Sequence, residues 1–161
     1  MITKILVGVD GSETSEKALN FALEVADKFS ASVLILNVFQ SPQEFEYQQN
    51  MLHQLPASES PREQIVNQPN NRFFIKDLRK VHETILSIAT ERATRLKPNL
   101  KISAELKEGA VSSQIVATAD YGQFDLIVVG HKGQRKIKEL FLGSTTEKVA
   151  HMAKCAVLIT N

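Results

Sequence analysis

The stretch "KILVGVDGSETSEKALNFALEVADKFSASVLILNVF", residues 4–39, decides the fold of this chain of 161 residues. It opens with a short apolar run that stops at Asp10 and Gly11, which is typical of a strand buried on both faces. Apolar residues at helical spacing follow over residues 12–30, with Ser12 in the position of an N-cap. A second apolar run fills residues 32–39. This order predicts a βαβ unit, in which two parallel strands are joined by a right-handed crossover.

The alternation of strands and helices continues toward the C-terminus. One face of a long helix, which should end before Pro98, is marked by Phe74, Leu78, Val81, Ile85, Ile88 and Arg92. We expect further strands over residues 100–109, 125–130 and 155–160, and further helices over residues 110–122 and 144–154. Five strands alternating with four helices predict an α/β fold, a three-layer α/β/α sandwich around a five-stranded, mostly parallel sheet.

Residues 41–71 interrupt this pattern. They contain four of the five prolines and many Gln and Asn residues, without a sustained apolar period. We interpret them as a surface excursion from a single domain that spans residues 1–161. Because the excursion follows the strand that ends near Val38, we expect it to shape access to a site or a partner.

Composition excludes several classes of function. With 19 basic and 18 acidic side chains, the chain has no overall field that would gather nucleic acid or an anionic membrane. No segment approaches the roughly 18 apolar residues of a membrane-spanning helix, and the single cysteine, Cys155, fits a reducing compartment. The spacing of His and Cys residues does not predict a metal site. We therefore expect a cytoplasmic protein with no nucleic-acid partner and no membrane partner.

A second stretch, "VVGHKGQRKIKELFLGSTTEKV" at residues 128–149, places three of the seven glycines around a basic segment. In parallel sheets, ligands bind beyond the carboxyl ends of the strands where the strand order reverses, which would bring Asp10 opposite Gly130. Gly130 and Gly133 would let the backbone approach an anion, and Gly143 and Ser144 would start a helix whose free N–H groups attract phosphate. We expect a positive φ at Gly133 and Gly143, and a polyphosphate as the ligand.

The spacing of Gly130, two residues, Gly133, nine residues, and then Gly143 and Ser144 resembles the G-2x-G-9x-G-(S/T) signature of nucleotide-binding universal stress proteins. The segments "ILVGVDGSE", "VLILNVF", "EGAVSSQIV" and "AKCAVLIT" extend the resemblance over most of the chain. It implies a Rossmann-like fold of the adenine nucleotide alpha hydrolase type, with strand order 3-2-1-4-5. It also implies an ATP-binding module in stress response or signalling.

The resemblance further implies a set of cofactor-binding positions, namely Asp10, Val38, Gly130, Lys132, Gly133, Gly143, Ser144 and Thr145. Asp10 would lie beside the ribose and phosphates and help to hold Mg²⁺, while Val38 would border the adenine. The first two glycines would line the ribose and phosphate path, and residues 143–145 would hold the terminal phosphates. The chain departs from the common pattern at Thr145, where relatives often carry valine, and at His131 and Lys132.

Simpler interpretations of these residues stay open. Ser144 with Glu147 has the spacing of a capping box, so its hydroxyl could serve the helix alone. Asp10 could only close the turn before Ser12, and the glycines could serve turns alone. Lys132 and the basic residues after it could be an ordinary solvated loop.

The sequence is compatible with three functions. The first is binding of ATP, or of AMP or another adenine nucleotide, with Mg²⁺. The second is a dimeric interaction module with little nucleotide affinity, and the third is a slow ATP hydrolase, although no general base is identified. No P-loop, dinucleotide fingerprint or nucleophile elbow is present in the sequence. A homodimer is expected through the C-terminal edge strand, by antiparallel pairing of Val157, Leu158 and Ile159 with a second copy.

Overall fold

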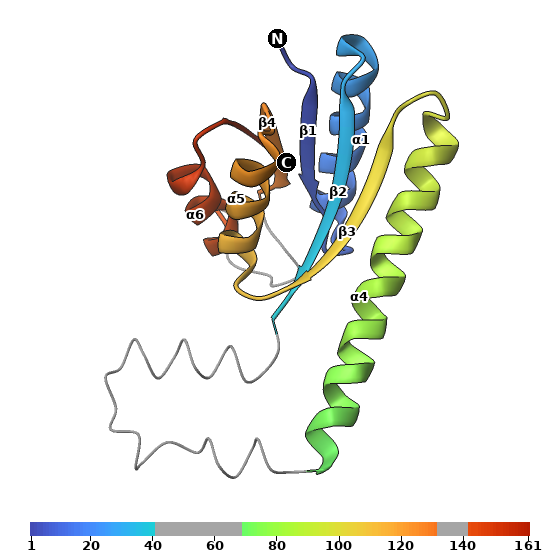
Figure 1. The fold of residues 1–161 in the computed structure, drawn as a ribbon, viewed down its shortest axis with the longest axis vertical. Coiled ribbons are helices and arrows are strands. Elements are labelled where there is room, and N and C mark those ends of the chain that lie inside the picture. The colour runs from blue at the N-terminus through green and yellow to red at the C-terminus, as the bar shows by residue number, and fades with distance from the viewer. Residues whose placement is uncertain (41–68, 132–141) are drawn as a thin grey trace.

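The computed structural model of the protein describes residues 1–40, 69–131 and 142–161. Its strands and helices alternate along the chain (Figure 1), and their bounds are β1 Lys4–Gly8, α1 Glu13–Phe29, β2 Ser32–Phe39, α4 Pro69–Leu96, β3 Ile102–Glu108, α5 Val111–Gly122, β4 Leu126–Gly130, α6 Ser144–Met152 and β5 Ala156–Thr160. Each predicted element is present. The predicted end of the long helix before Pro98 is confirmed by the last residue of α4, Leu96.

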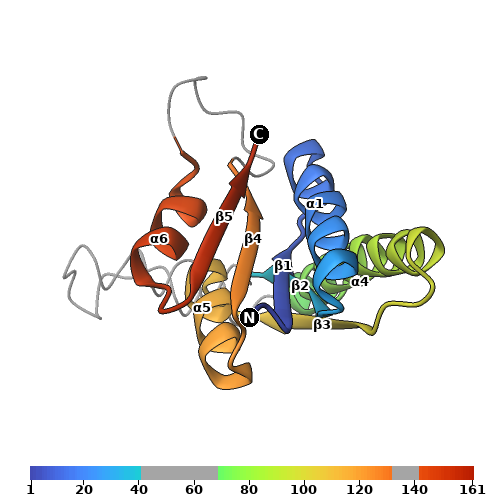
Figure 2. The ribbon, with the colours of Figure 1, turned by 90° about the horizontal axis from the view of Figure 1, so that it is seen from above.

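The five strands form one parallel sheet in the order β3-β2-β1-β4-β5. This confirms the predicted order 3-2-1-4-5. Helices α1 and α4 cover one face of the sheet and α5 and α6 cover the other, so the molecule has the three predicted layers (Figure 2). Strands β1 and β4 are neighbours, and the direction in which strands are added to the sheet reverses between them.

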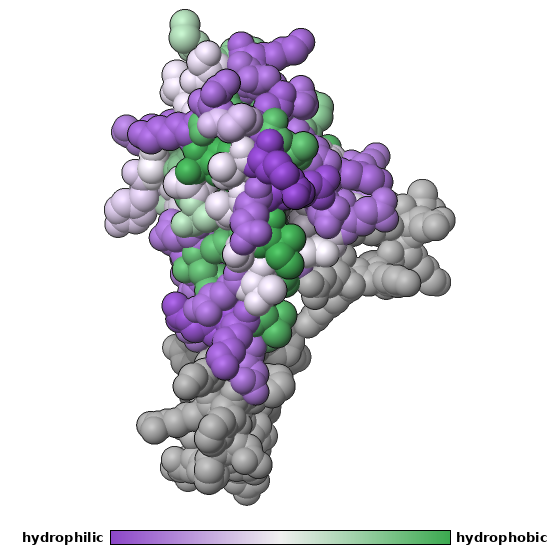
Figure 3. Space-filling model, turned by 90° about the vertical axis from the view of Figure 1, so that its right-hand side faces the viewer, coloured by the Kyte–Doolittle hydropathy of each residue, from purple (hydrophilic) through white to green (hydrophobic). Residues whose placement is uncertain are grey.

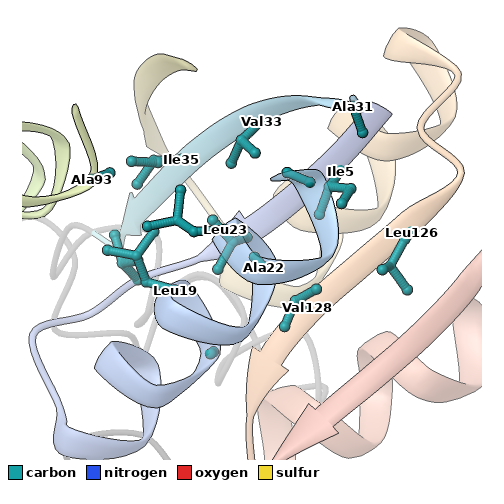
Figure 4. Close-up of a cluster of buried hydrophobic side chains, with 14 residues drawn as sticks. Ile5, Leu19, Ala22, Leu23, Ala31, Val33, Ile35, Ala93, Leu126 and Val128 are labelled. Carbon is teal, nitrogen blue, oxygen red and sulfur yellow. The ribbon is translucent and has the colours of Figure 1, made fainter. Parts of the chain in front are cut away.

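The core follows the alternation of side chains along each strand. Ile5 and Val7 of β1 point into a cluster on the side of α1 and α4, while Leu6 points into a second cluster on the side of α5 and α6. All three are fully buried, which confirms that this strand is covered on both faces. Figure 4 shows the first cluster, where Leu19 and Leu23 of α1 lie against the sheet.

Helix α1 begins as predicted. The Ser12 hydroxyl is the N-cap and accepts a hydrogen bond from the Ser15 N–H at 3.2 Å. The helix ends at Ser30 in a left-handed conformation, with φ of 54°. A two-residue connection then suffices to start β2, because the chain reverses sharply at that point.

The face of α4 that packs on the sheet agrees only in part with the predicted one. Val81 and Ile88 are 55% and 62% exposed, and Figure 3 shows hydrophobic residues among hydrophilic ones on this side of the molecule. The packed face carries Ile85 of the predicted set, which is half-buried and would lie 3.4 Å from a Cβ atom on Gly11, together with Leu86, Ala89 and Ala93, of which Ala93 is fully buried. Small side chains let the helix approach the sheet closely, whereas the inner face was predicted from the positions of the large apolar residues.

The predicted excursion at residues 41–71 lies mostly outside the described residues. Its last three positions are helical, because α4 begins at Pro69. Proline is favoured in the first turn of a helix, where its missing N–H has no intrahelical acceptor to lose. Assigning Pro69 to irregular chain was therefore wrong.

Among the described residues, none of the helices combines the length and the apolar character needed to span a membrane.

Candidate functional site at the carboxyl ends of β1, β2 and β4

The start of α1 lies against the end of β4, which brings the two predicted halves of the site together. A Cβ atom on Gly130 would come within 2.7 Å of the Thr14 hydroxyl oxygen and 2.8 Å of the Thr14 carbonyl carbon. Such distances are not tolerated, so glycine is required here for helix packing. The Thr160 hydroxyl at the end of β5 also donates to the Thr14 carbonyl, at 3.3 Å. Thr14 was not among the predicted residues.

Asp10 closes the turn between β1 and α1. One of its carboxylate oxygens, Oδ1, accepts hydrogen bonds from the Ser12 N–H at 2.9 Å and from the Ser12 hydroxyl. Gly11 between them has φ of 80°, a conformation that favours glycine. The turn-closing interpretation of Asp10 is therefore correct, and a ligand role would come in addition to it.

The start of α6 differs from the predicted capping box. The N-cap is Gly143, with φ of −61° and no side-chain cap, and Ser144 is the first helical residue. The positive φ expected at Gly143 is therefore wrong, and the Ser144 hydroxyl does not cap the helix. The Gly143 N–H donates to the His131 carbonyl at 2.8 Å. Phosphate could therefore meet only the N–H groups that follow it in the first turn of α6.

Thr146 ties α6 to β4 and was missed by the sequence argument. It is buried, and its hydroxyl donates to the Gly130 carbonyl at 2.8 Å. The His131 N–H donates to the Thr160 carbonyl at 2.8 Å, which joins the same region to β5. Together these bonds hold the first turn of α6 beside the end of β4, with Ser144 exposed and Thr145 half-buried.

Val38 lies near the end of β2, with its side chain buried in the cluster on the side of α5 and α6. Its backbone is therefore the part that could contact a ligand. The Leu36 carbonyl accepts from Val9 of the β1 side at 2.9 Å, and the Phe39 carbonyl accepts from Gly109 on the β3 side at 2.9 Å. Since backbone groups alternate between the two sides of a strand, the N–H and C=O of Val38 face the β1 side.

A polar cluster that the sequence argument missed lies next to Val38. Asn37 is fully buried in β2, and its side-chain oxygen lies 2.7 Å from Nδ1 of His82 on α4. The His82 ring stacks on Phe39, with 5.4 Å between centroids and 27° between planes. Burial lowers the pKa of His82, and the negative charge of Asp10 opposes this shift in part. The signal available in the sequence was one Asn inside an otherwise apolar strand.

This geometry can be compared with that of known proteins. The model of the universal stress protein family matches residues 1–161. The chain belongs to this family. The universal stress protein YxiE of Bacillus subtilis is 31% identical to it over 163 residues, which cover 99% of each protein.

Solved structures of universal stress proteins share the fold. The protein UspA from Lactobacillus plantarum matches with a TM-score of 0.75 at 21% identity, over 99% of this chain and 97% of that one. A universal stress protein in complex with cAMP matches with a TM-score of 0.65 at 25% identity, again over 99% of this chain and 97% of that one. That second protein holds an adenine nucleotide.

One further atom of this universal stress protein lies beside these residues. Within the part of the chain that the structure describes, Nδ1 of His131, which directly follows Gly130, is buried and has no hydrogen-bond partner. A buried polar atom without a partner is uncommon and is a position where a ligand could bind. Lys132 and Gly133, the two other predicted site residues of this segment, lie outside the described residues.

Proposed function

We propose that this universal stress protein binds an adenine nucleotide, ATP with Mg²⁺, beyond the carboxyl ends of β1, β2 and β4. The observation that carries the proposal is the packing of Thr14 on Gly130, because it sets the starts of α1 and α6 around one point where the strand order reverses. The adenine nucleotide in a related solved structure supports the same class of ligand.

In this proposal the phosphates meet the first turn of α6. The N–H groups of Ser144 and Thr145 have no intrahelical acceptor, and the helix dipole adds partial positive charge there. Gly143 has no side chain, so the phosphates can come close to its backbone. Its N–H is not available to them, because it donates to the His131 carbonyl. Lys132 and Gly133 would complete the phosphate path between Gly130 and α6.

The metal ion would be held chiefly by the nucleotide. The described residues contain no group of three or more His, Cys, Asp or Glu side chains that could hold a metal ion. Mg²⁺ commonly takes its ligands from phosphates and water, with one or two carboxylates from the protein. Asp10 would supply such a carboxylate beside the ribose and phosphates.

The adenine would lie at the end of β2. The backbone N–H and C=O of Val38 face the β1 side, where they can form hydrogen bonds with a planar base. The buried side chain of Val38 holds this segment of backbone in place. AMP or another adenine nucleotide would use the same contacts with fewer phosphate bonds.

Two other functions belong to the same proposal as alternatives. A module that acts by dimerisation would use β5, whose outer edge has no neighbouring strand among the described residues, so that Val157, Leu158 and Ile159 can pair with a second copy. A slow ATP hydrolase would need a general base, for which His82 and Asp10 are the titratable groups near the end of β2. We place the protein, as one domain over residues 1–161, in the cytoplasm.

The test compares two substitutions of similar size at Ser144. Ser144→Asp keeps a residue suited to the first turn of a helix but repels phosphate, whereas Ser144→Asn is the neutral control. Calorimetry with ATP and Mg²⁺ should show a loss of at least about tenfold in affinity for the Asp variant only, which is about 1.4 kcal/mol. Equal affinities for both variants and the wild type would remove α6 from the site. Extraction of freshly purified protein should also release a bound adenine nucleotide.

A further inference from the structure

Asn37 is the one fully buried side chain with an amide group in the described part of the sheet, and both ends of that amide are paired. Its Nδ2 donates to the Val9 carbonyl at 2.8 Å, and its Oδ1 lies 2.7 Å from Nδ1 of His82. An amide inside an apolar strand is costly unless it is hydrogen-bonded, and apolar residues such as Ile35 fill the other positions on this face of β2.

The hydrogen bond to Val9 fixes the orientation of the Asn37 amide, and this orientation fixes which atom donates in the bond to His82. Because the Val9 carbonyl can only accept, the Asn37 nitrogen must face it and the Asn37 oxygen must face His82. Nδ1 of His82 must then carry the hydrogen, in the neutral ring as well as in the charged one. The stacking of the ring on Phe39 fixes its plane, so α4 holds the Asn37 amide in a single orientation.

This orientation decides where the ladder between β1 and β2 ends. The last bond runs from the Val9 N–H to the Leu36 carbonyl, at 2.9 Å. In a parallel ladder the next bond would run from the Val38 N–H to the Val9 carbonyl. The Asn37 side chain takes that carbonyl instead, and within the described residues the Val38 N–H has no backbone acceptor.

We infer that Asn37 and His82 are positioning residues that end the β1–β2 ladder at Val9 and so keep the Val38 N–H available to select adenine. This inference rests on the proposed nucleotide site. The Val38 N–H donates to the ring nitrogen N1 of adenine, and the Val38 carbonyl accepts from the 6-amino group. Hypoxanthine and guanine carry a hydrogen on N1 and an oxygen at position 6, so both contacts become repulsive for these bases.

The discrimination between adenine and the other purine bases is strong, because it depends on buried backbone groups of Val38. A site that presents one donor and one acceptor loses both bonds to the wrong base and leaves its own groups unpaired. Without Asn37 or His82, the Val38 N–H can turn to the Val9 carbonyl and extend the ladder by one bond. The base then loses its donor, while the phosphate contacts at α6 are unchanged.

The experiment measures the affinities for ATP and ITP, each with Mg²⁺, by calorimetry on the full chain. The two nucleotides differ only at positions 1 and 6 of the base. The variants are Asn37→Leu, which is close in size and leaves no polar group, and His82→Leu, which releases the Asn37 amide. The control is Val81→Ala, because Val81 precedes His82 on α4 and is 55% exposed.

We expect the wild type and the control to prefer ATP by about tenfold or more, and both leucine variants to show a preference that is smaller by at least about threefold, because only the Val38 carbonyl then still discriminates between the two bases. Loss of stability alone would lower both affinities and keep their ratio. Variants that retain the wild-type ratio therefore overturn the inference and leave the nucleotide site intact. A wild type that binds neither nucleotide overturns the proposed function itself.

A measurement without ligand tests the backbone part separately. In Asn37→Leu the Val38 amide should exchange its hydrogen about tenfold more slowly than in the wild type, because it gains the Val9 carbonyl as acceptor. His82→Leu should also slow the exchange, because it releases the Asn37 amide from the Val9 carbonyl. Equal or faster exchange in both variants would overturn the inference, whatever the nucleotide data show.

Discussion

Replacing Gly130 with alanine tests whether the packing of α1 on the end of β4 holds the site together. The added methyl group would lie 2.7 Å from Oγ1, 2.8 Å from the carbonyl carbon and 2.9 Å from Cβ of Thr14. Two of these three atoms belong to the backbone or are fixed to it, so the start of α1 must move. Overpacking of this kind costs about 1–3 kcal/mol.

The neighbouring strand offers a matched control. Gly8 ends β1 as Gly130 ends β4, but a methyl group there would lie 3.4 Å from Val129 and 3.6 Å from Ile115, which are ordinary contacts. Gly8→Ala should therefore be neutral, or should stabilise the protein by about 0.4–1 kcal/mol because it restricts the unfolded chain. Adding Thr14→Ala to Gly130→Ala should rescue little, since the carbonyl carbon and Cβ of residue 14 remain.

Thermal unfolding and urea unfolding, each followed by circular dichroism, provide the measurement. For a domain of this size, each kcal/mol shifts the melting temperature by about 2–4 °C, so Gly130→Ala should melt about 2–12 °C below the wild type. Its affinity for ATP should fall more than that of Gly8→Ala, because α1 and α6 are displaced from each other. If both alanine variants unfold at the same urea concentration, Gly130 is not required for packing.

Two further predictions concern pH and assembly. Burial lowers the pKa of His82 in the folded state, so the folded state binds the extra proton less readily than the unfolded state does. The contribution of neutral His82 to stability is therefore fully present above the unfolded pKa of about 6.5. It is lost as the pH falls through the folded pKa. The difference in stability between wild type and His82→Gln should therefore shrink from pH 8 to pH 5 in thermal melts, and a constant difference would contradict this. The proposed dimer should be broken by Leu158→Pro with Val157→Lys on β5, and light scattering over a dilution series would detect the change. A wild type that is monomeric at micromolar concentration, or a variant that stays dimeric, would contradict pairing through this strand.

The site was predicted in outline but not in its contacts. Asp10, Gly130 and the start of α6 could be placed at one edge of the sheet because parallel strands put their carboxyl ends together, and the glycine spacing marked the same region. The cap of α6 was assigned to Ser144 from its spacing to Glu147, yet the structure uses Gly143. The hydrogen bond from Gly143 to His131 fixes where the helix begins, and a bond between residues twelve positions apart is not encoded in a local motif.

The sequence by itself determined the order of the elements and the two buried faces of the sheet. Short apolar runs such as residues 4–9, rich in β-branched residues, favour strands covered on both sides, and their alternation with helical segments leaves few arrangements other than a parallel sheet with helices on each face. Local chemistry also set the start of α1 at Ser12, since the cap lies within three residues of its partner.

Only the tertiary structure decided which side chains share the site. The rotation of α4 depends on small residues such as Ala93 that allow close contact with the sheet, and it brings His82 to Asn37 across 45 positions of chain. Gly130 was predicted to admit a ligand, and only the tertiary structure shows that Thr14 also packs against it. Contacts of this kind depend on how whole elements pack, because no periodicity along the chain records the distance between two surfaces that meet only after folding.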